Sequence, residues 1–261
     1  MNTDLLLIDF QNDFCSPDGS LYVMGAKDDC IRISDFICRN LNKIDNIYVT
    51  MDTHSLYHIA HPLFWKTPEG NHPDFYTQIT YKDFFEKKFL PCDSSITDRV
   101  DEYLQNLEEK NRYTLTIWPP HCLFGSIGAA LESNVFSALH EWEKAKIGRR
   151  VNFITKAMNP YTEHYSAIQA EIPDPNDPET HTNKKLIDKI KDSKIIVAGE
   201  ALSHCVANTI RDLSQYIPTS HITLLTDCCS NVAGFEYMGE GFYNCFTSKG
   251  MRSATSKELI L

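Results

Sequence analysis

Residues 194–213 of the chain read KIIVAGEALSHCVANTIRDL, an apolar run followed by a short turn and then by a helical pattern. The run Lys194–Ala198 is continuous rather than alternating, as in strands that are buried on both faces of a sheet. Val206, Ile210 and Leu213 recur at the spacing of one helix face. A buried strand that leads into a helix in this way is typical of an α/β fold.

The same alternation of patterns extends over most of the chain. Further strand-length apolar runs are Leu5–Asp9, Asn46–Met51, Val151–Thr155, Ile222–Thr226 and Tyr243–Phe246, and helical spacing is found at Ile33–Leu41, Val100–Leu107, Ile127–Leu139 and Leu186–Ile190. Alternating strands and helices imply right-handed crossovers and therefore a parallel sheet. The sequence predicts a three-layer α/β/α fold around a doubly wound, mainly parallel sheet of six strands.

Two stretches interrupt this alternation. One is aromatic and charged and covers residues 62–112, and the other is rich in proline and acidic residues and covers residues 171–183. A chain of 261 residues is long enough for one large domain or two small ones. We interpret both stretches as insertions on the sheet and expect a single domain over residues 1–261.

Composition and charge exclude several classes of protein. The chain is 42% hydrophobic, and its 25 Lys and Arg against 35 Asp and Glu give a formal net charge of -10, which disfavours a nucleic-acid-binding surface. No apolar run reaches the roughly 18 residues of a membrane span, and no signal-peptide pattern is present. The nine cysteines form no CxxC pair, which fits a reducing compartment. We expect a cytoplasmic protein that binds neither nucleic acid nor membranes.

Ionisable residues stand at the ends of the predicted strands: Asp9, Asp52 with His54, Lys156, Cys205 and Asp227. Ligands of open parallel sheets bind at the carboxyl ends of the strands. A cysteine attacks as its thiolate, a nearby cation lowers the pKa of the thiol, and a carboxylate can accept the thiol proton. Cys205, Lys156 and Asp9 are therefore a candidate nucleophile, cation and base. Taken singly, each also fits an ordinary turn cap, surface lysine or buried small side chain.

A second set of residues has the chemistry of metal ligands. Asp52 and His54 lie two positions apart on an extended segment, so their side chains point to the same side and can bind one cation. His121 follows two prolines in the segment WPPH, residues 118–121, and is the candidate for a third ligand. His58 and His61 are close enough in the sequence to add a fourth ligand or to hydrogen bond to one.

Taken together, these segments resemble the isochorismatase-like cysteine hydrolases and, within them, the nicotinamidase branch. The matching pieces are LLLIDFQNDF (5–14), DTH (52–54), WPPHC (118–122), GSIGA (125–129), ITK (154–156) and VAGEALSHCV (197–206). The resemblance implies a triad of Cys205, Lys156 and Asp9 that cleaves a carbon–nitrogen amide bond through a thioester. It also implies an oxyanion hole formed by the main-chain N–H groups of Ala201 and Cys205, with a cis peptide bond at Glu200–Ala201.

The resemblance also implies a metal ion. In the nicotinamidase branch a divalent ion binds the residues that match Asp52, His54 and His121, joined in some members by the residue that matches His58. The ion holds the pyridine nitrogen of the substrate. Zinc is the ion expected here, with iron and manganese as alternatives.

The aromatic residues that match Phe14 and Trp118 sandwich a flat ring in this family, with Tyr165 or Tyr161 as a further wall. The predicted function is hydrolysis of a small-molecule amide, nicotinamide or a related (hetero)aromatic amide, to the acid and ammonia. A carbamoyl or ureido amidohydrolase and a non-catalytic binding protein on the same fold stay open as alternatives. Assembly into a homo-oligomer, which is frequent in the family, is open as well.

The chain departs from the family pattern in two places. Before the nucleophile the family usually has Thr-Asp-x-Cys, whereas residues 202–205 here are LSHC. The segment between His54 and Trp118 is longer than in compact nicotinamidases. The first departure concerns the hydrogen bonding around the nucleophile. We expect the long segment, together with the proline-rich loop after Tyr165, to cover or reshape the substrate pocket.

Overall fold

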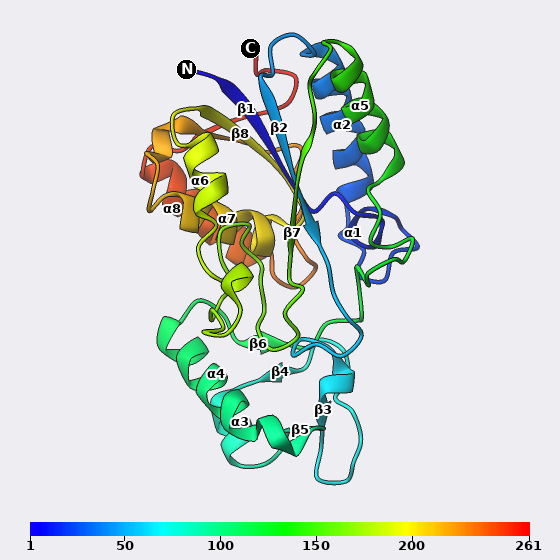
Figure 1. Cartoon of the computed structure of the whole chain (residues 1–261), viewed down its shortest axis with the longest axis vertical. Helices are drawn as coiled ribbons and strands as arrows, with labels where there is room; N and C mark the ends of the chain where they lie inside the picture. The colour runs from blue at the N-terminus through cyan, green and yellow to red at the C-terminus, as the bar shows by residue number, and fades with distance from the viewer.

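The computed structural model describes residues 1–261, and its centre is a six-stranded parallel sheet (Figure 1). The strands are β1 (Thr3–Ile8), β2 (Asn46–Asp52), β7 (Asn152–Lys156), β8 (Lys194–Gly199), β9 (Ile222–Leu225) and β10 (Arg252–Ala254). Their order across the sheet is β10-β9-β8-β1-β2-β7, with Leu6 of β1 opposite both Val197 of β8 and Tyr48 of β2. The connections run in opposite directions from β1 and β8, so the switch point of this doubly wound sheet lies between these two strands.

Helices cover the two faces of the sheet, as Figure 1 shows. The chain forms α1 (Asn12–Cys15), α2 (Ala26–Arg39), α5 (Ser133–Lys144), α6 (Lys184–Ile190), α7 (Ala207–Leu213) and α8 (Glu236–Ser248) in this part of the molecule. α2 and α5 pack against each other on one face, and α6, α7 and α8 lie on the other, which is the arrangement that right-handed crossovers require. The three-layer α/β/α fold predicted from the sequence is confirmed.

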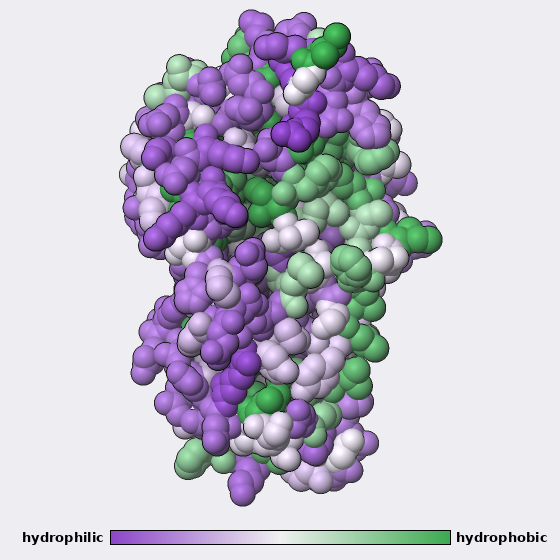
Figure 2. Space-filling model, in the orientation of Figure 1, coloured by the Kyte–Doolittle hydropathy of each residue, from purple (hydrophilic) through white to green (hydrophobic).

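Burial along the strands depends on their place in the sheet. β1 and β8 are buried almost throughout, as continuous apolar runs predict. β7, in contrast, alternates between exposed and less exposed residues because it is an edge strand, and 56% of Phe153 is exposed. In the view of Figure 2 the surface is mostly hydrophilic, and hydrophobic residues gather in a band down the right of the centre.

Two of the predicted elements differ from the structure, and one strand of the sheet was not predicted. Tyr243–Phe246 is not a strand but part of α8, since Phe242 and Phe246 lie one helical turn apart and are both buried. A short apolar run does not by itself distinguish a buried strand from a buried helix. The sixth strand is instead the short and mostly exposed β10. α5 begins only at Ser133, six residues after Ile127, where the Glu132 carboxylate accepts the first free N–H groups.

Residues 62–117 form a lobe below the carboxyl ends of the strands (Figure 1). It contains α3 (Tyr81–Phe85), α4 (Thr97–Lys110) and two antiparallel pairs, β3 (Trp65–Lys66) with β5 (Leu90–Pro91) and β4 (Gln78–Ile79) with β6 (Leu115–Thr116). Short 3-10 turns occur at Pro62–Phe64, Ser94–Ile96, Pro178–Thr180 and Thr219–His221. Trp65 and Leu104 of the lobe belong to the same hydrophobic core as the strands, which supports the proposal that the chain is one domain.

None of the helices combines the length and the apolar character that crossing a bilayer requires.

Candidate active site

Three of the predicted residues meet at the carboxyl ends of β1, β7 and β8. Asp9 follows β1, Lys156 ends β7, and Cys205 lies in a π-helical turn, Leu202–Val206, that leads into α7. Lys156 Nζ is 2.8 Å from Asp9 Oδ2 and 3.7 Å from Cys205 Sγ. All three residues are buried. We call Asp9, Lys156 and Cys205 the strand-end group.

Neighbouring strands hold Asp9 in place. Its backbone turns into the left-handed region with φ of 50° directly after β1. The Asp9 N–H donates to Thr50 Oγ1 on β2 at 3.0 Å, and the same hydroxyl donates to Asp9 Oδ1. The position of this carboxylate therefore depends on the pairing of β1 with β2, and Thr50 is a site residue that the sequence patterns did not single out.

The turn before Cys205 is shaped by close contact with β1. Gly199 has φ of 148°, and a Cβ there would lie 2.2 Å from the carbonyl oxygen of Ile8, so a glycine is required. The next peptide bond, Glu200–Ala201, is cis, as the resemblance implies. The Ala201 N–H donates to no group of the chain. The helical turn begins at Leu202, before the apolar spacing that starts at Val206, and this places the thiol within the first turn.

Asp52 connects the strand-end group to the predicted metal ligands. Its Oδ1 is 2.9 Å from Lys156 Nζ, while its Oδ2 is 3.3 Å from His121 Nε2 and 3.4 Å from His54 Nδ1. Gln11 fixes the main chain of Asp52 by two hydrogen bonds of 2.7 Å, one donated by Gln11 Nε2 to the Asp52 carbonyl and one accepted by Gln11 Oε1 from the Asp52 N–H. The two oxygens of the Asp52 carboxylate thus have different partners: Oδ1 faces Lys156, and Oδ2 faces the two histidines.

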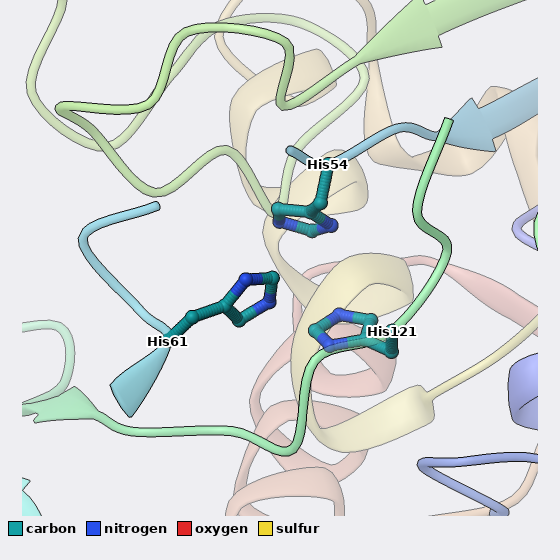
Figure 3. Close-up of side chains that lie close together, drawn as sticks. All are labelled: His54, His61 and His121. Carbon is teal, nitrogen blue, oxygen red and sulfur yellow. The ribbon is translucent and has the colours of Figure 1, made fainter. Parts of the chain in front are cut away.

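His54, His61 and His121 point toward one another (Figure 3), and one ring nitrogen from each lies within 4.8 Å of the other two. We call these three residues the histidine group. His61 Nδ1 is 3.2 Å from the Ser55 carbonyl and His121 Nδ1 is 2.8 Å from the Pro119 carbonyl, so in both rings this nitrogen carries the proton. In the neutral rings Nε2 then carries the lone pair; Nε2 of His61 has no partner in the chain, and Nε2 of His121 faces Asp52.

Several nitrogens of this cluster have no hydrogen-bond partner in the chain. Both ring nitrogens of His54 and Nε2 of His61 are buried without one. Buried polar atoms are normally paired, and unpaired acceptors that converge on one point fit a bound cation. The residues present therefore fit a divalent metal ion.

His58 is oriented differently from the histidine group. Its Nδ1 accepts a hydrogen bond of 3.2 Å from the Ala60 N–H, so a neutral ring carries its proton on Nε2. It lies near His54 and Glu163 instead, and one possible ligand atom from each of these three residues is within 4.8 Å of the other two. The geometry favours His61 over His58 as the residue that joins His54 and His121.

Burial and neighbouring charges set the protonation states. Burial raises the pKa of the Cys205 thiol well above its usual range, against the effect of the Lys156 charge. Burial also raises the pKa of Asp9, while Lys156 opposes this shift. Burial favours the neutral form of Lys156, but the carboxylates of Asp52 and Asp9 outweigh it and raise the pKa of the lysine. The surroundings therefore favour the charged form of Lys156 and the protonated form of the Cys205 thiol.

The histidine group is largely uncharged. Burial lowers the pKa of His54 well below its usual range, and it lowers the pKa of His61 to about 3. His121 differs, because its hydrogen bond to Asp52 raises its pKa although burial opposes the shift. Neutral imidazole is the form that binds metal ions.

A small pocket of about 30 Å³ lies in front of Cys205. The predicted aromatic walls Phe14, Trp118 and Tyr165 all line it, and Trp118 Nε1 donates to the Tyr165 hydroxyl at 2.9 Å. Tyr161 lies outside this pocket, where the guanidinium of Arg99 stacks on its ring at 3.9 Å.

The pocket has further walls that the sequence patterns did not single out: Leu21, Val23, Glu163, His204 and Val232. The three apolar residues carry no chemical signal in a sequence. Glu163 and His204 are polar and buried. His204 directly precedes Cys205 in the sequence, and of these five residues it is the one that the sequence could have indicated as a pocket residue.

Asp227, the remaining residue at a strand end, takes no part in the site. Its carboxylate accepts hydrogen bonds from the Ser256 N–H at 2.6 Å and from the Ser256 hydroxyl at 2.8 Å. It stabilises the segment after β10, as an aspartate in a turn commonly does.

Comparison with known proteins places this geometry in context. No protein-family model matches the chain. Over 205 residues the chain is 27% identical to the nicotinamidase of Saccharomyces cerevisiae, a match that covers 78% of this chain and 78% of that protein.

Two solved structures extend the comparison to the fold. The nicotinamidase pyrazinamidase of Acinetobacter baumanii has a TM-score of 0.67 at 21% identity and covers 99% of this chain and 98% of its own. The pyrazinamidase of Pyrococcus horikoshii, solved in complex with zinc, has a TM-score of 0.60 at 18% identity and covers 98% of this chain and 99% of its own. The chain therefore has the nicotinamidase fold, and its resemblance to the nicotinamidase-related branch of the isochorismatase-like hydrolases is confirmed.

Proposed function

We propose that the protein hydrolyses the carbon–nitrogen bond of a small (hetero)aromatic amide, with nicotinamide as the first candidate, and releases the acid and ammonia. The observation that carries this proposal is that Cys205 lines an aromatic pocket and lies 3.7 Å from Lys156, which is itself paired with Asp9. The similarity to a yeast nicotinamidase supports it.

Asp9 acts as the base in the first half of the reaction. Because burial keeps the Cys205 thiol protonated, attack on the amide carbon requires a group that accepts the thiol proton. The Asp9 carboxylate accepts it as the sulfur–carbon bond forms. Asp9 then donates this proton to the leaving nitrogen, the carbon–nitrogen bond breaks, and ammonia leaves a thioester on Cys205.

The second half returns the site to its starting state. Asp9 deprotonates a water molecule, whose oxygen attacks the thioester carbon. The carbon–sulfur bond then breaks to release the acid, and Asp9 returns the proton to the departing sulfur, which restores the thiol and the carboxylate. The positive charge of Lys156, 2.8 Å from Asp9, offsets the negative charge that moves between sulfur and carboxylate.

Main-chain donors stabilise the oxygen that becomes negative during both attacks. We assign this role to the N–H groups of Ala201 and Cys205, both of which line the pocket. The free Ala201 N–H supports the assignment. One donor of this kind typically contributes about 10²–10³ in rate.

His54, His61 and His121, together with Asp52, are the residues that would hold a divalent ion. An imidazole and carboxylate set suits zinc, and iron or manganese also fit it. When bound, the ion offers a Lewis-acidic position to the ring nitrogen of the amide. Phe14, Trp118 and Tyr165 orient the flat ring between them.

A cytoplasmic location is part of the proposal. All nine cysteines are free thiols in the structure, which supports a reducing compartment.

Ammonia release tests the function directly. The panel contains nicotinamide, benzamide and a carbamoyl amide, and the proteins are the zinc-loaded chain, Cys205→Ala and the exposed-cysteine control Cys245→Ala. We expect release from nicotinamide that Cys205→Ala abolishes and Cys245→Ala leaves unchanged. Full turnover by Cys205→Ala contradicts the proposal, and release from the carbamoyl amide alone that survives chelation of the metal favours the carbamoyl alternative.

A further inference from the structure

The helix beside the nucleophile has one polar face. His204, Asn208 and Arg211 are spaced by four and three residues, so they lie one above the other along this face. Asn208 is buried, and its Oδ1 accepts a hydrogen bond of 3.1 Å from Arg211 Nη1. Buried polar side chains lower the stability of a fold unless they are hydrogen bonded. A row of three polar residues that extends from Cys205 along one helix face therefore suggests a function.

His204 and Arg211 line a cavity of about 390 Å³. The cavity lies between α7, the first turns of α8 and the residues around β6 of the inserted lobe; Arg112, Thr114, Phe235 and Tyr237 are among its walls. It is more than ten times as large as the pocket in front of Cys205, and His204 is the one residue that lines both.

The His204 ring forms the partition between the two spaces. It packs edge-on against Trp118 and Tyr165, with centroids at 5.3 and 5.2 Å, and against Phe235 at 5.0 Å. Its Nδ1 is 2.9 Å from Ser203 Oγ, and its Nε2 makes no hydrogen bond within the chain. Movement of this one side chain would join the pocket in front of Cys205 to the larger cavity. The larger cavity reaches the surface, since exposed side chains such as Tyr237 line it.

The two arginines of the cavity differ in their charge partners. Arg112 is paired with two buried carboxylates, Asp212 Oδ1 at 2.5 Å and Glu171 Oε2 at 3.3 Å. Arg211 forms no ion pair; besides Asn208, its guanidinium faces the Phe242 ring at 5.6 Å. In a chain with a net charge of -10, a half-buried guanidinium without a carboxylate partner is available to an anion from outside.

We propose that this cavity is a carboxylate-binding vestibule, in which Arg211 binds the carboxylate of the acid product after it has passed His204. The inference rests on the proposed function, since hydrolysis turns an uncharged amide into a carboxylate. A guanidinium binds a carboxylate by two parallel hydrogen bonds, which a neutral amide cannot replace. The same chemistry would also bind a carboxylate carried by a larger substrate, and the experiment distinguishes the two sources.

Binding is measured first, without turnover. Nicotinate and nicotinamide are titrated calorimetrically into zinc-loaded Cys205→Ala, alone and combined with Arg211→Gln, Arg211→Lys or the exposed control Arg252→Gln. We expect Arg211→Gln to weaken nicotinate binding at least tenfold and to lower the acid-to-amide affinity ratio by a similar factor. Arg211→Lys, which keeps the charge and guards against misfolding, should recover part of the affinity, and Arg252→Gln should change nothing. Equal nicotinate affinity of Arg211→Gln and its parent, with both folded, overturns the proposal.

Turnover then identifies the source of the carboxylate. If the product is the ligand, Arg211→Gln raises the inhibition constant of nicotinate, and a pyridine amide that bears a carboxylate is no better a substrate than nicotinamide. If the substrate carries the carboxylate, that amide has the higher kcat/KM, and Arg211→Gln removes its advantage. Because the titrations need no catalysis, the two proposals can fail separately. If the parent protein cleaves no amide and Arg211→Gln still weakens nicotinate binding, the proposed function is refuted and the carboxylate site is supported.

Discussion

The strand-end group and the histidine group lie side by side but are held in different ways. The strand-end group is attached to paired strands, and its charges already have partners, since Lys156 faces two carboxylates. The histidine group is attached to loops, and hydrogen bonds from ring nitrogens to main-chain carbonyls orient two of its rings. Both ring nitrogens of His54 and Nε2 of His61 have no hydrogen-bond partner. The first group is electrostatically complete within the chain, whereas the second requires a cation from outside.

Asp52 contacts both groups, with one carboxylate oxygen on each. Variants of the two groups should therefore differ in their effects. Changes in the strand-end group should reduce chemistry or stability and leave metal binding in place, and changes in the histidine group should do the reverse.

The largest effect is expected from Asp9→Asn. Loss of the base should lower kcat/KM for the amide by about 10²–10⁴, the usual contribution of general base catalysis. Zinc content per chain should stay that of the parent, because Asp9 contacts no residue of the histidine group. The exposed Asp35→Asn serves as the control, and a loss of zinc in Asp9→Asn would show that the two groups are not separable.

Lys156→Met should mainly destabilise the fold. It leaves the buried carboxylates of Asp9 and Asp52 without their cation, and breaking a buried ion pair in this way costs about 3–5 kcal/mol. Urea denaturation measures the change in the free energy of unfolding, with the exposed Lys146→Met as the matched control. A loss below about 1 kcal/mol would mean that the two carboxylates share a proton and need no lysine.

His61→Gln should weaken zinc binding by at least about tenfold, whereas His58→Gln should have the smaller effect, because the His58 nitrogen nearest Ala60 already accepts a hydrogen bond. Competition with a chromophoric chelator gives both affinities. The rate at which Cys205 is alkylated in the metal-free protein should be the same in both variants. The opposite order of the two affinities would assign the fourth ligand to His58.

The smallest effect concerns Glu171, a buried carboxyl outside both groups. Burial raises its pKa to about 7, although Arg112 opposes this shift. The folded state then binds the proton more tightly than the unfolded state, so this contribution to stability is complete below about pH 4.5 and is lost as the pH rises through 7.

The test compares the free energy of unfolding at pH 5.5 and pH 8. We expect Glu171→Gln to reduce the fall in stability between these values by about 1 kcal/mol or more, while the exposed Glu109→Gln leaves it unchanged. An unaltered pH dependence in Glu171→Gln would mean that Arg112 keeps this carboxylate ionised in the folded protein.

Much of the strand-end group was predictable because each member is tied to a local pattern. A continuous apolar run specifies a strand buried on both faces, and parallel strands carry whatever follows them to the same edge. Asp9, Lys156 and Cys205 are far apart in the chain, yet the order of the strands brings them within contact distance. Where the run was short, as at Tyr243–Phe246, the same reasoning was wrong.

The histidine group was only partly predictable. The Asp-x-His spacing and the proline-stiffened His121 are local signals, and they indicated three of the residues that converge. The choice between His58 and His61 depends on which loop carbonyl or N–H each ring meets, and no sequence spacing encodes this. Gln11 and Thr50 were also missed, because a single polar side chain that holds a neighbouring strand has no periodic signature.

The sequence by itself determined the α/β class, the edge of the sheet where chemistry is placed, and the residue types that are brought there, since these follow from burial patterns and strand order. Only the tertiary structure decided the size of the pocket, the partition at His204 and the unpaired charge of Arg211, because these depend on where an inserted lobe packs. That packing is set by contacts between residues distant in the chain, in which each pair contributes too little to leave a local pattern.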